Sequence, residues 1–291
     1  MKYTMSHLVA RVLVILGVAL VGTTTAQGAV VATVPVGVAP TGLAVSPDGT
    51  HVYVANTGVG TVSVLNAATN ALDATVPVGI SPIGVAVSPD GTRVYVANSI
   101  STSDTVSVID TATNAVVATV PVGDVPFGVA VSPDGTRVYV ANFASATVSI
   151  IDTASNTVVA TVPVGNGPNG VAVSPDGTRV YVTNTVSNTV SVIDTALDAE
   201  VTTVGGVALF PPGAAVSSPN GVAVSPDGTR VYVVNNRSNT VSVINAATNA
   251  VDATVPVGRF PQAAAVSPDG TRVYVTNANS NAVSIIDATL P

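Results

Sequence analysis

The side chains that usually carry catalysis are scarce in this chain of 291 residues. It contains two histidines, His7 and His51, one glutamate, Glu200, and no cysteine or tryptophan. The lack of cysteine excludes disulfides, thiolate metal ligands and a cysteine nucleophile. His51 stands where equivalent segments of the chain carry arginine, so we interpret it as a surface substitution.

Most aspartates recur in a fixed context, which favours a structural role. Six of them occupy the third position of Ser-Pro-Asp-Gly, at Asp48, Asp90, Asp134, Asp176, Asp227 and Asp269. An aspartate in such a turn accepts hydrogen bonds from its own local backbone. The sequence has no Asp-x-Asp-x-Asp-Gly calcium loop. We therefore predict no catalytic residue, no metal site and no cofactor.

The charge balance limits the kinds of partner. Charged residues make up 9% of the chain, and the formal net charge is −7. Two of the nine basic residues, Lys2 and Arg11, lie in the N-terminal segment. The chain beyond that segment therefore has seven arginines and sixteen acidic residues. Such an acidic chain is a poor partner for nucleic acid or an anionic membrane. The absence of lysine beyond Lys2 excludes Schiff-base chemistry.

Residues 1–29 have the pattern of a secretory signal peptide. Two basic residues precede a short apolar run at 12–22, and small residues follow it. The run is shorter than the roughly 20 residues that a membrane span needs. We expect the remaining chain, residues 30–291, to be secreted, extracellular or on the cell surface, or periplasmic in a Gram-negative cell, without a membrane span.

The rest of the chain is one unit repeated six times. Ser-Pro-Asp-Gly begins at residues 46, 88, 132, 174, 225 and 267, at intervals of 42, 44, 42, 51 and 42. Each unit contains four short runs rich in valine, isoleucine, tyrosine and threonine, separated by turn residues. A period in the 40s with four strands per unit is typical of a propeller blade. The runs are almost wholly apolar, as expected where stacked blades cover both faces of every sheet.

The chain ends indicate how the ring closes. Residues 31–36 read as a lone fourth strand, and residues 283–287 read as a third strand with no fourth after it. We therefore predict an all-β protein, a single six-bladed propeller of four-stranded antiparallel blades, closed by the N-terminal strand pairing with the last blade. Such a closed ring is expected to be a monomer.

The repeats resemble a known family. Tyr181–Asn184 and Tyr274–Asn277 read Tyr-Val-Thr-Asn, and the units share SPDGTRVYV and TVSVID. These motifs resemble the YVTN family of β-propeller repeats, found in surface-layer and secreted proteins, and are more distantly similar to YncE-like and lactonase-type propellers. Many of these relatives have seven blades, so six repeats depart from that pattern. The resemblance implies a fold and a location, and no single activity.

The positions that vary between repeats mark the candidate ligand-contacting face. They lie in the loops from each fourth strand to the next first strand, in the loops between second and third strands, and in an insertion at 205–217, which we interpret as either a binding loop or a plug. The candidate contact residues are Asp124, Phe127, Asn169, Leu209, Phe210, Asn220, Arg259, Phe260 and Gln262.

Two functions fit these residues. The scarcity of catalytic groups favours a non-enzymatic interaction or structural module that contacts a protein or glycan at the cell envelope. The alternative is a small-molecule hydrolase or lyase of the lactonase-like propeller type. That alternative requires polar groups at the funnel of the propeller, and the sequence offers Asp124 and Arg259 there.

Overall fold

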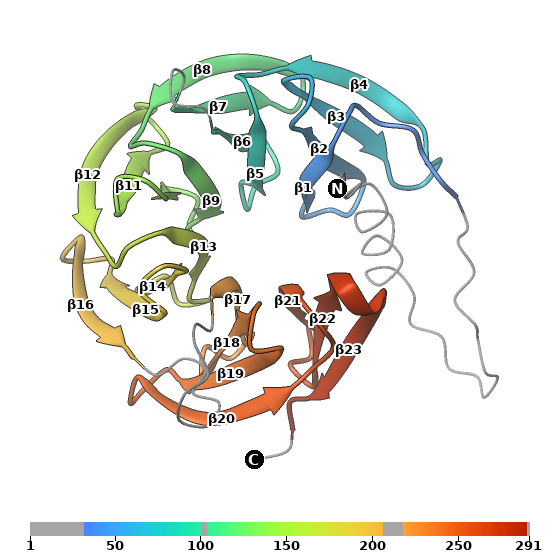
Figure 1. The fold of residues 1–291 in the computed structure, drawn as a ribbon. Helices are drawn as coiled ribbons and strands as arrows, with labels where there is room; N and C mark the ends of the chain where they lie inside the picture. The colour runs from blue at the N-terminus through green and yellow to red at the C-terminus, as the bar shows by residue number, and fades with distance from the viewer. Residues whose placement is uncertain (1–31, 100–103, 206–217, 290–291) are drawn as a thin grey trace.

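The described part of the protein is a ring of antiparallel sheets. The computed structural model describes residues 32–99, 104–205 and 218–289. These residues form six sheets arranged around a central axis (Figure 1). This confirms the predicted all-β six-bladed propeller, whereas the predicted signal peptide, residues 1–29, lies outside the described ranges. Within those ranges, no helix is long and apolar enough to cross a membrane.

Each blade starts beside the central axis with a strand whose first residue is proline. These innermost strands are β1 (Pro40–Val45), β5 (Pro82–Val87), β9 (Pro126–Val131), β13 (Pro168–Val173), β17 (Pro219–Val224) and β21 (Pro261–Val266). The Ser-Pro-Asp-Gly turns lead into the second strands, which are β2 (His51–Asn56), β6 (Arg93–Asn98), β10 (Arg137–Asn142), β14 (Arg179–Asn184), β18 (Arg230–Asn235) and β22 (Arg272–Asn277).

The outer half of each blade follows in chain order. The third strands are β3 (Thr61–Asn66), β7 (Thr105–Asp110), β11 (Thr147–Asp152), β15 (Thr189–Asp194), β19 (Thr240–Asn245) and β23 (Ala282–Asp287). The fourth strands, at the rim, are β4 (Leu72–Pro77), β8 (Ala115–Pro121), β12 (Thr157–Pro163), β16 (Ala199–Val204) and β20 (Ala250–Pro256). A 3-10 turn, η1 (Ala278–Ser280), precedes β23. We number the blades one to six in this order.

The Ser-Pro-Asp-Gly turn is held by its own side chains. In blade three the Ser132 hydroxyl donates to Asp134 Oδ1 and accepts the Arg137 N–H. The Thr136 N–H donates to the same carboxylate at 3.0 Å. Since the other five turns repeat the serine–aspartate bond, the recurring aspartates have the structural role predicted from the sequence.

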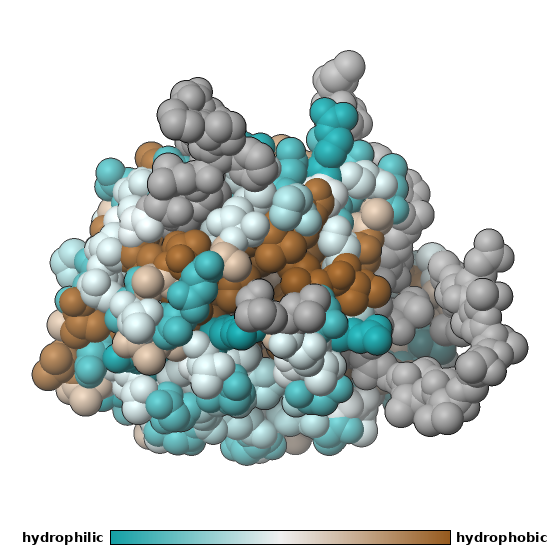
Figure 2. Space-filling view, turned by 90° about the horizontal axis from the view of Figure 1, so that it is seen from below, coloured by the Kyte–Doolittle hydropathy of each residue, from teal (hydrophilic) through white to brown (hydrophobic). Residues whose placement is uncertain are grey.

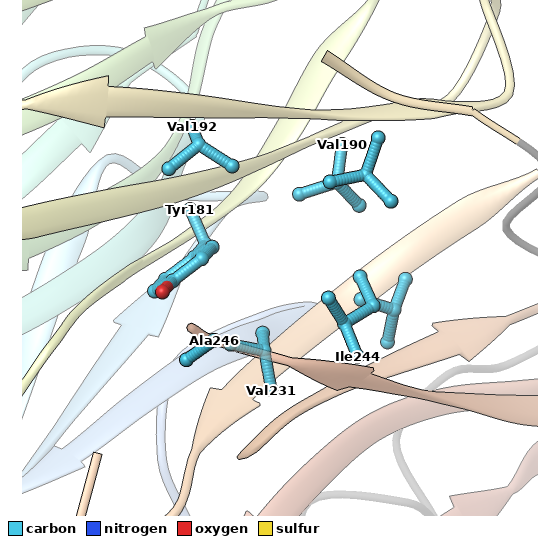
Figure 3. Close-up of a cluster of buried hydrophobic side chains, with 8 residues drawn as sticks. Tyr181, Val190, Val192, Val231, Ile244 and Ala246 are labelled. Carbon is cyan, nitrogen blue, oxygen red and sulfur yellow. The ribbon is translucent and has the colours of Figure 1, made fainter. Parts of the chain in front are cut away.

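The apolar core lies between neighbouring blades. Figure 3 shows Tyr181 and Val192 of blade four facing Val231 and Ile244 of blade five. Equivalent clusters fill the junctions of blades one to four and of blades five and six. Both faces of a typical blade are therefore covered, which explains why its strands are apolar throughout. On the outer wall of the ring, apolar side chains form a band bordered by hydrophilic residues (Figure 2).

The last blade differs from the prediction. Its sheet contains β21, β22 and β23 alone, and residues 32–36 form no strand. Val34 and Val36 instead pack against Val52, Val54 and Leu65 of blade one. The predicted pairing of the N-terminal strand with the last blade is thus wrong for the described residues. Figure 1 shows blade six standing apart from blade one, whereas other consecutive blades lie side by side.

One substitution provides a physical reason for this open junction. At the other five junctions the innermost strand has a glycine, and a Cβ there would lie closer than 3.0 Å to a carbonyl oxygen of the next blade. Blade six carries Ala263 at that position. A sixth junction of the same geometry would press the Ala263 methyl group against backbone, which cannot move aside cheaply.

Candidate functional site

The loops that enter each blade and the loops between its second and third strands share one face of the ring, here called the loop face. Backbone hydrogen bonds join them: the Thr57 N–H donates to the Ala39 carbonyl at 3.1 Å, and the Phe143 N–H donates to the Val125 carbonyl at 2.9 Å. This confirms that both loop sets lie together, as the sequence predicted.

The second residue of each innermost strand lies at the axial edge of the loop face. These residues form the second-position ring: Thr41, Ile83, Phe127, Asn169, Asn220 and Gln262. In every blade a register shift leaves this residue outside the backbone ladder with the second strand. Its identity is therefore not dictated by strand pairing, which explains why it varies between otherwise similar repeats.

One half of the second-position ring is formed by carboxamides. Asn169, Asn220 and Gln262 occupy consecutive blades four to six. The Asn220 amide Nδ2 donates to Gln262 Oε1 at 3.2 Å, across a blade boundary. The Asn220 carbonyl accepts the Thr183 hydroxyl at 2.6 Å, which fixes the backbone beneath the amide. This half offers neutral donors and acceptors of the kind that bind hydroxyl and carbonyl groups.

The other half is largely apolar. The rings of Phe127 and Phe143 lie with centroids 5.4 Å apart and planes tilted by 60°, an edge-to-face type of contact. Thr41 shares a 2.7 Å hydrogen bond with the Thr57 hydroxyl. The sequence analysis selected Phe127 but did not name its partner Phe143, which lies in the loop between the second and third strands of blade three. The chain has four phenylalanines, and two of them fall in blade three at the loop face, which is the signal that could have identified the pair.

The remaining candidate residues are spread around the loop face. Asp124 is exposed on the loop into blade three, and its N–H donates to the Ser145 hydroxyl at 2.6 Å. Arg259 and Phe260 are exposed on the loop into blade six, three blades away. Blades three and six lie on opposite sides of the axis, so these residues do not form one cluster (Figure 1). Leu209, Phe210 and the 205–217 insertion, apart from Gly205, lie outside the described residues.

The loops into the blades contain backbone strain. The residue before the first proline has a positive φ in every blade, including 57° at Val125 and 57° at Phe260. Blade four has Gly167 there, with φ 66°. A left-handed conformation is costly for a β-branched residue such as valine. The fold therefore holds these loop residues in a conformation that local preference opposes.

The charged groups outside the loop face form structural contacts. His51 Nε2 lies 3.5 Å from Asp73 Oδ2, and both side chains are exposed. Arg137 bridges to the next blade through Asp198 at 2.9 Å. A hydrogen bond from the Ser46 hydroxyl, together with bonds from Thr50, lowers the pKa of Asp48 to about 2. Within the described ranges, no group of three or more histidine, aspartate or glutamate side chains could hold a metal ion.

Asn236 has a structural role that its sequence context conceals. It begins an Asn-Arg-Ser tripeptide, the acceptor pattern for N-glycosylation. Its side chain is buried, and its Nδ2 donates to the Pro261 carbonyl at 2.9 Å. This amide therefore joins blade five to the first strand of blade six instead of presenting itself to solvent.

Comparison with known families gives a match over the C-terminal half of the ring. Residues 152–289 match a family model described as lactonase, 7-bladed beta-propeller. That range contains Asn169, Asn220 and Gln262, the carboxamide half of the second-position ring. No curated protein sequence matches the chain.

Solved structures with a similar fold include three bacterial proteins. The periplasmic gluconolactonase PpgL of Pseudomonas aeruginosa is 22% identical with a TM-score of 0.73, over 86% of this chain and 81% of that one. A functionally unknown protein from Desulfotomaculum acetoxidans is 18% identical with a TM-score of 0.66, over 82% and 79%. Hydrazine synthase of Kuenenia stuttgartiensis is 23% identical with a TM-score of 0.60, over 92% and 100%. These likenesses show the propeller fold alone.

Proposed function

We propose that this protein binds a lactone-type cyclic small molecule at the second-position ring and hydrolyses it. The observation that carries the proposal is that the residues matching the family model include the three carboxamides of the second-position ring. The part of the chain that matches the lactonase family model is the part that places Asn169, Asn220 and Gln262 on consecutive blades beside the axis. Of the two functions considered from the sequence, the family match and the gluconolactonase neighbour favour the hydrolase over the non-enzymatic module.

The ring residues suit such a ligand chemically. Carboxamide N–H groups donate to the hydroxyl and carbonyl oxygens of an oxidised sugar ring, and carboxamide oxygens accept from its hydroxyl groups. The apolar half, with Phe127 against Phe143, offers a surface for the carbon face of the ring. A donor held toward the lactone carbonyl also stabilises the negative charge that develops there during attack.

We assign the general base to Asp124. It is exposed on the loop that leads into Phe127, whereas Asp104 of the same face already accepts the Val125 N–H at 3.0 Å. In the reaction Asp124 accepts a proton from water as the water oxygen attacks the lactone carbonyl carbon. The ring C–O bond then breaks, and the released alkoxide takes up that proton, leaving a hydroxy acid.

The test is hydrolysis of glucono-1,5-lactone by the purified protein. The rate of acid release is measured and compared with the rate in buffer alone. We expect turnover by the wild type and a loss of about 100-fold or more in Asp124→Asn. Asp252→Asn, on an exposed rim strand, serves as the matched control and should retain full activity. Binding without turnover would support the non-enzymatic reading instead, and an active Asp124→Asn variant would contradict the assigned base.

The location is part of the same proposal. Residues 1–29 support export to the periplasm or the cell exterior, as does the resemblance of the repeats to the YVTN family. Fractionation of the producing cell, with detection of a mature chain that starts between residues 27 and 30, tests it. A full-length chain in the cytosol would contradict it.

A further inference from the structure

The flank of blade six that points away from blade five is exposed where the other blades are covered. Ile285 is 57% exposed, and Tyr274 and Val283 are only half-buried. The residues equivalent to Ile285 are almost completely buried, at Val64 1%, Val108 0%, Ile150 0%, Val192 0% and Val243 8%. This flank therefore carries the apolar side chains that the other blades bury against their neighbours, but here no neighbouring blade of the described chain covers them.

The outer edge of the same blade is also incomplete. Among the residues that the structure describes, no fourth strand lies beside β23, so its outward backbone groups form an open ladder edge. Four of the five rim strands in the described ranges end in proline, which limits further pairing. β23 contains no proline. An exposed edge of this kind is ready to pair with an added strand.

The chain also contains a strand segment without a sheet. Residues 32–37 read Ala-Thr-Val-Pro-Val-Gly, and the same six residues recur at 74–79, over the last four residues of β4 and the two that follow. Val34 and Val36 pack on Val52 and Leu65 of blade one, as Val76 packs on Val94 and Ile109 of blade two. We call this segment the strap. It packs on blade one in the same way as the outer strand of blade one packs on blade two.

We propose that the strap of one copy completes blade six of a second copy, so that the protein associates head to tail. Within one chain, Ala263 opposes the close approach of innermost strands that the five other junctions use. Between two chains the junction need not close around a common axis, so the blades can meet at their outer strands. Each copy carries one donor strap and one acceptor edge, which makes the interface heterologous.

A basic side chain on the acceptor flank fits this junction. Arg179 and Arg230 donate to the carbonyls of Ala246 and Ala288 in the following blade, at 2.9 and 2.8 Å. Arg272, the equivalent residue of blade six, is exposed. The matching carbonyl on blade one is that of Ala67, so Arg272 of one copy would donate to Ala67 of the next.

The register of the new pair follows from the other blades. Ser63 lies opposite Thr75 in blade one, and Ser107 lies opposite Thr119 in blade two. The same register places Thr33 of the strap opposite Ser284 of β23. The sequence contains no cysteine, so introduced cysteines report this pairing alone.

The experiment mixes two single variants, Thr33→Cys and Ser284→Cys, under mild oxidation and resolves the products without reductant. We expect a disulfide-linked species of twice the chain mass from the mixture, whereas the matched control Thr75→Cys with Ser284→Cys should give none. Light scattering of the wild type should show mass rising with concentration. A monomeric wild type, or a Thr33→Cys/Ser284→Cys double variant that crosslinks only within one chain, would overturn the proposal. This test is independent of lactone turnover.

Discussion

Asn220 donates its side-chain amide to Gln262 across the boundary between blades five and six, at 3.2 Å. The two residues come from separate repeats, and each occupies the second position of an innermost strand. Their bond shows that the variable positions of two neighbouring repeats come into contact beside the axis and share a surface there. The function proposed for the protein depends on that surface.

Substitution of Asn220 tests its role in ligand binding. We expect Asn220→Ala to raise the KM for glucono-1,5-lactone about fivefold, since one hydrogen bond to the ligand contributes about 1 kcal/mol. Steady-state kinetics checks this. Asn245→Ala is the matched control, because Asn245 holds a turn at the other end of its blade through the N–H groups of Ala247 and Thr248. Equal KM values in both variants would place the ligand elsewhere.

Relief of backbone strain should stabilise the loop into blade three. Val125 has φ 57°, a conformation that glycine adopts without steric cost, as Gly167 does in blade four. Val125→Gly should therefore raise the free energy of unfolding by about 1 kcal/mol in a urea titration. Val129→Gly, in the regular part of β9, should lower it by about 2 kcal/mol. A destabilised Val125→Gly variant would show that the valine side chain contributes more than the strain costs.

The glycines of the blade junctions should tolerate no methyl group. A Cβ at Gly128 would lie against the Asn169 carbonyl of the next blade, so Gly128→Ala should lower the free energy of unfolding by about 2 kcal/mol or more. The reverse change at the equivalent position of blade six, Ala263→Gly, should alter it by less than about 1 kcal/mol. Calorimetric melting of the two variants compares them. A gain of about 1 kcal/mol or more in Ala263→Gly would mean that blade six does meet a neighbouring backbone.

The turn aspartates make the stability of the fold depend on pH in the acid range. The serine and threonine donors lower the pKa of Asp48 and of Asp269 to about 2 and shift the pKa of Asp90, Asp134 and Asp176 in the same direction. A carboxyl whose folded pKa lies below its unfolded value of about 3.9 stabilises the fold above that value. The stabilisation is lost as the pH falls through the folded pKa.

The urea midpoint should accordingly stay constant from pH 7 to 5 and fall between about pH 4 and 2. Asp134→Asn should reduce that fall, because one titrating group is removed. A midpoint that drops already between pH 7 and 5 would implicate other groups.

The blades could be predicted from the sequence because the strand and turn patterns that form them are local and are repeated six times. Valine-rich runs alternate with turns, including Ser-Pro-Asp-Gly, and this pattern indicates four strands per unit. Because the pattern occurs six times, an irregular residue in one repeat does not obscure it. The positions of the candidate residues on the loop face followed from the same pattern. Phe127, Asn169, Asn220 and Gln262 occupy the same position of their innermost strands beside the axis. Asp124 and Arg259 lie in the loops before two of these strands, in blades three and six, and are therefore separated from each other.

The sequence prediction failed where one contact between distant segments decides the outcome. The closure of the ring depends on whether blade six can approach blade one, and Ala263 matters only once its neighbours are known in space. The left-handed conformation of Val125 is likewise imposed by tertiary structure against the preference of valine. The pairing of Phe127 with Phe143 arises from the meeting of two loops, which repeat spacing alone does not reveal.

The initial rate of glucono-1,5-lactone opening by the purified wild-type protein shows whether this propeller is a lactonase. We expect a rate that saturates with lactone, exceeds the buffer rate in proportion to enzyme concentration, and falls when Asn220 and Gln262 are both changed to alanine. A rate equal to that of buffer at every lactone concentration would contradict the proposed function.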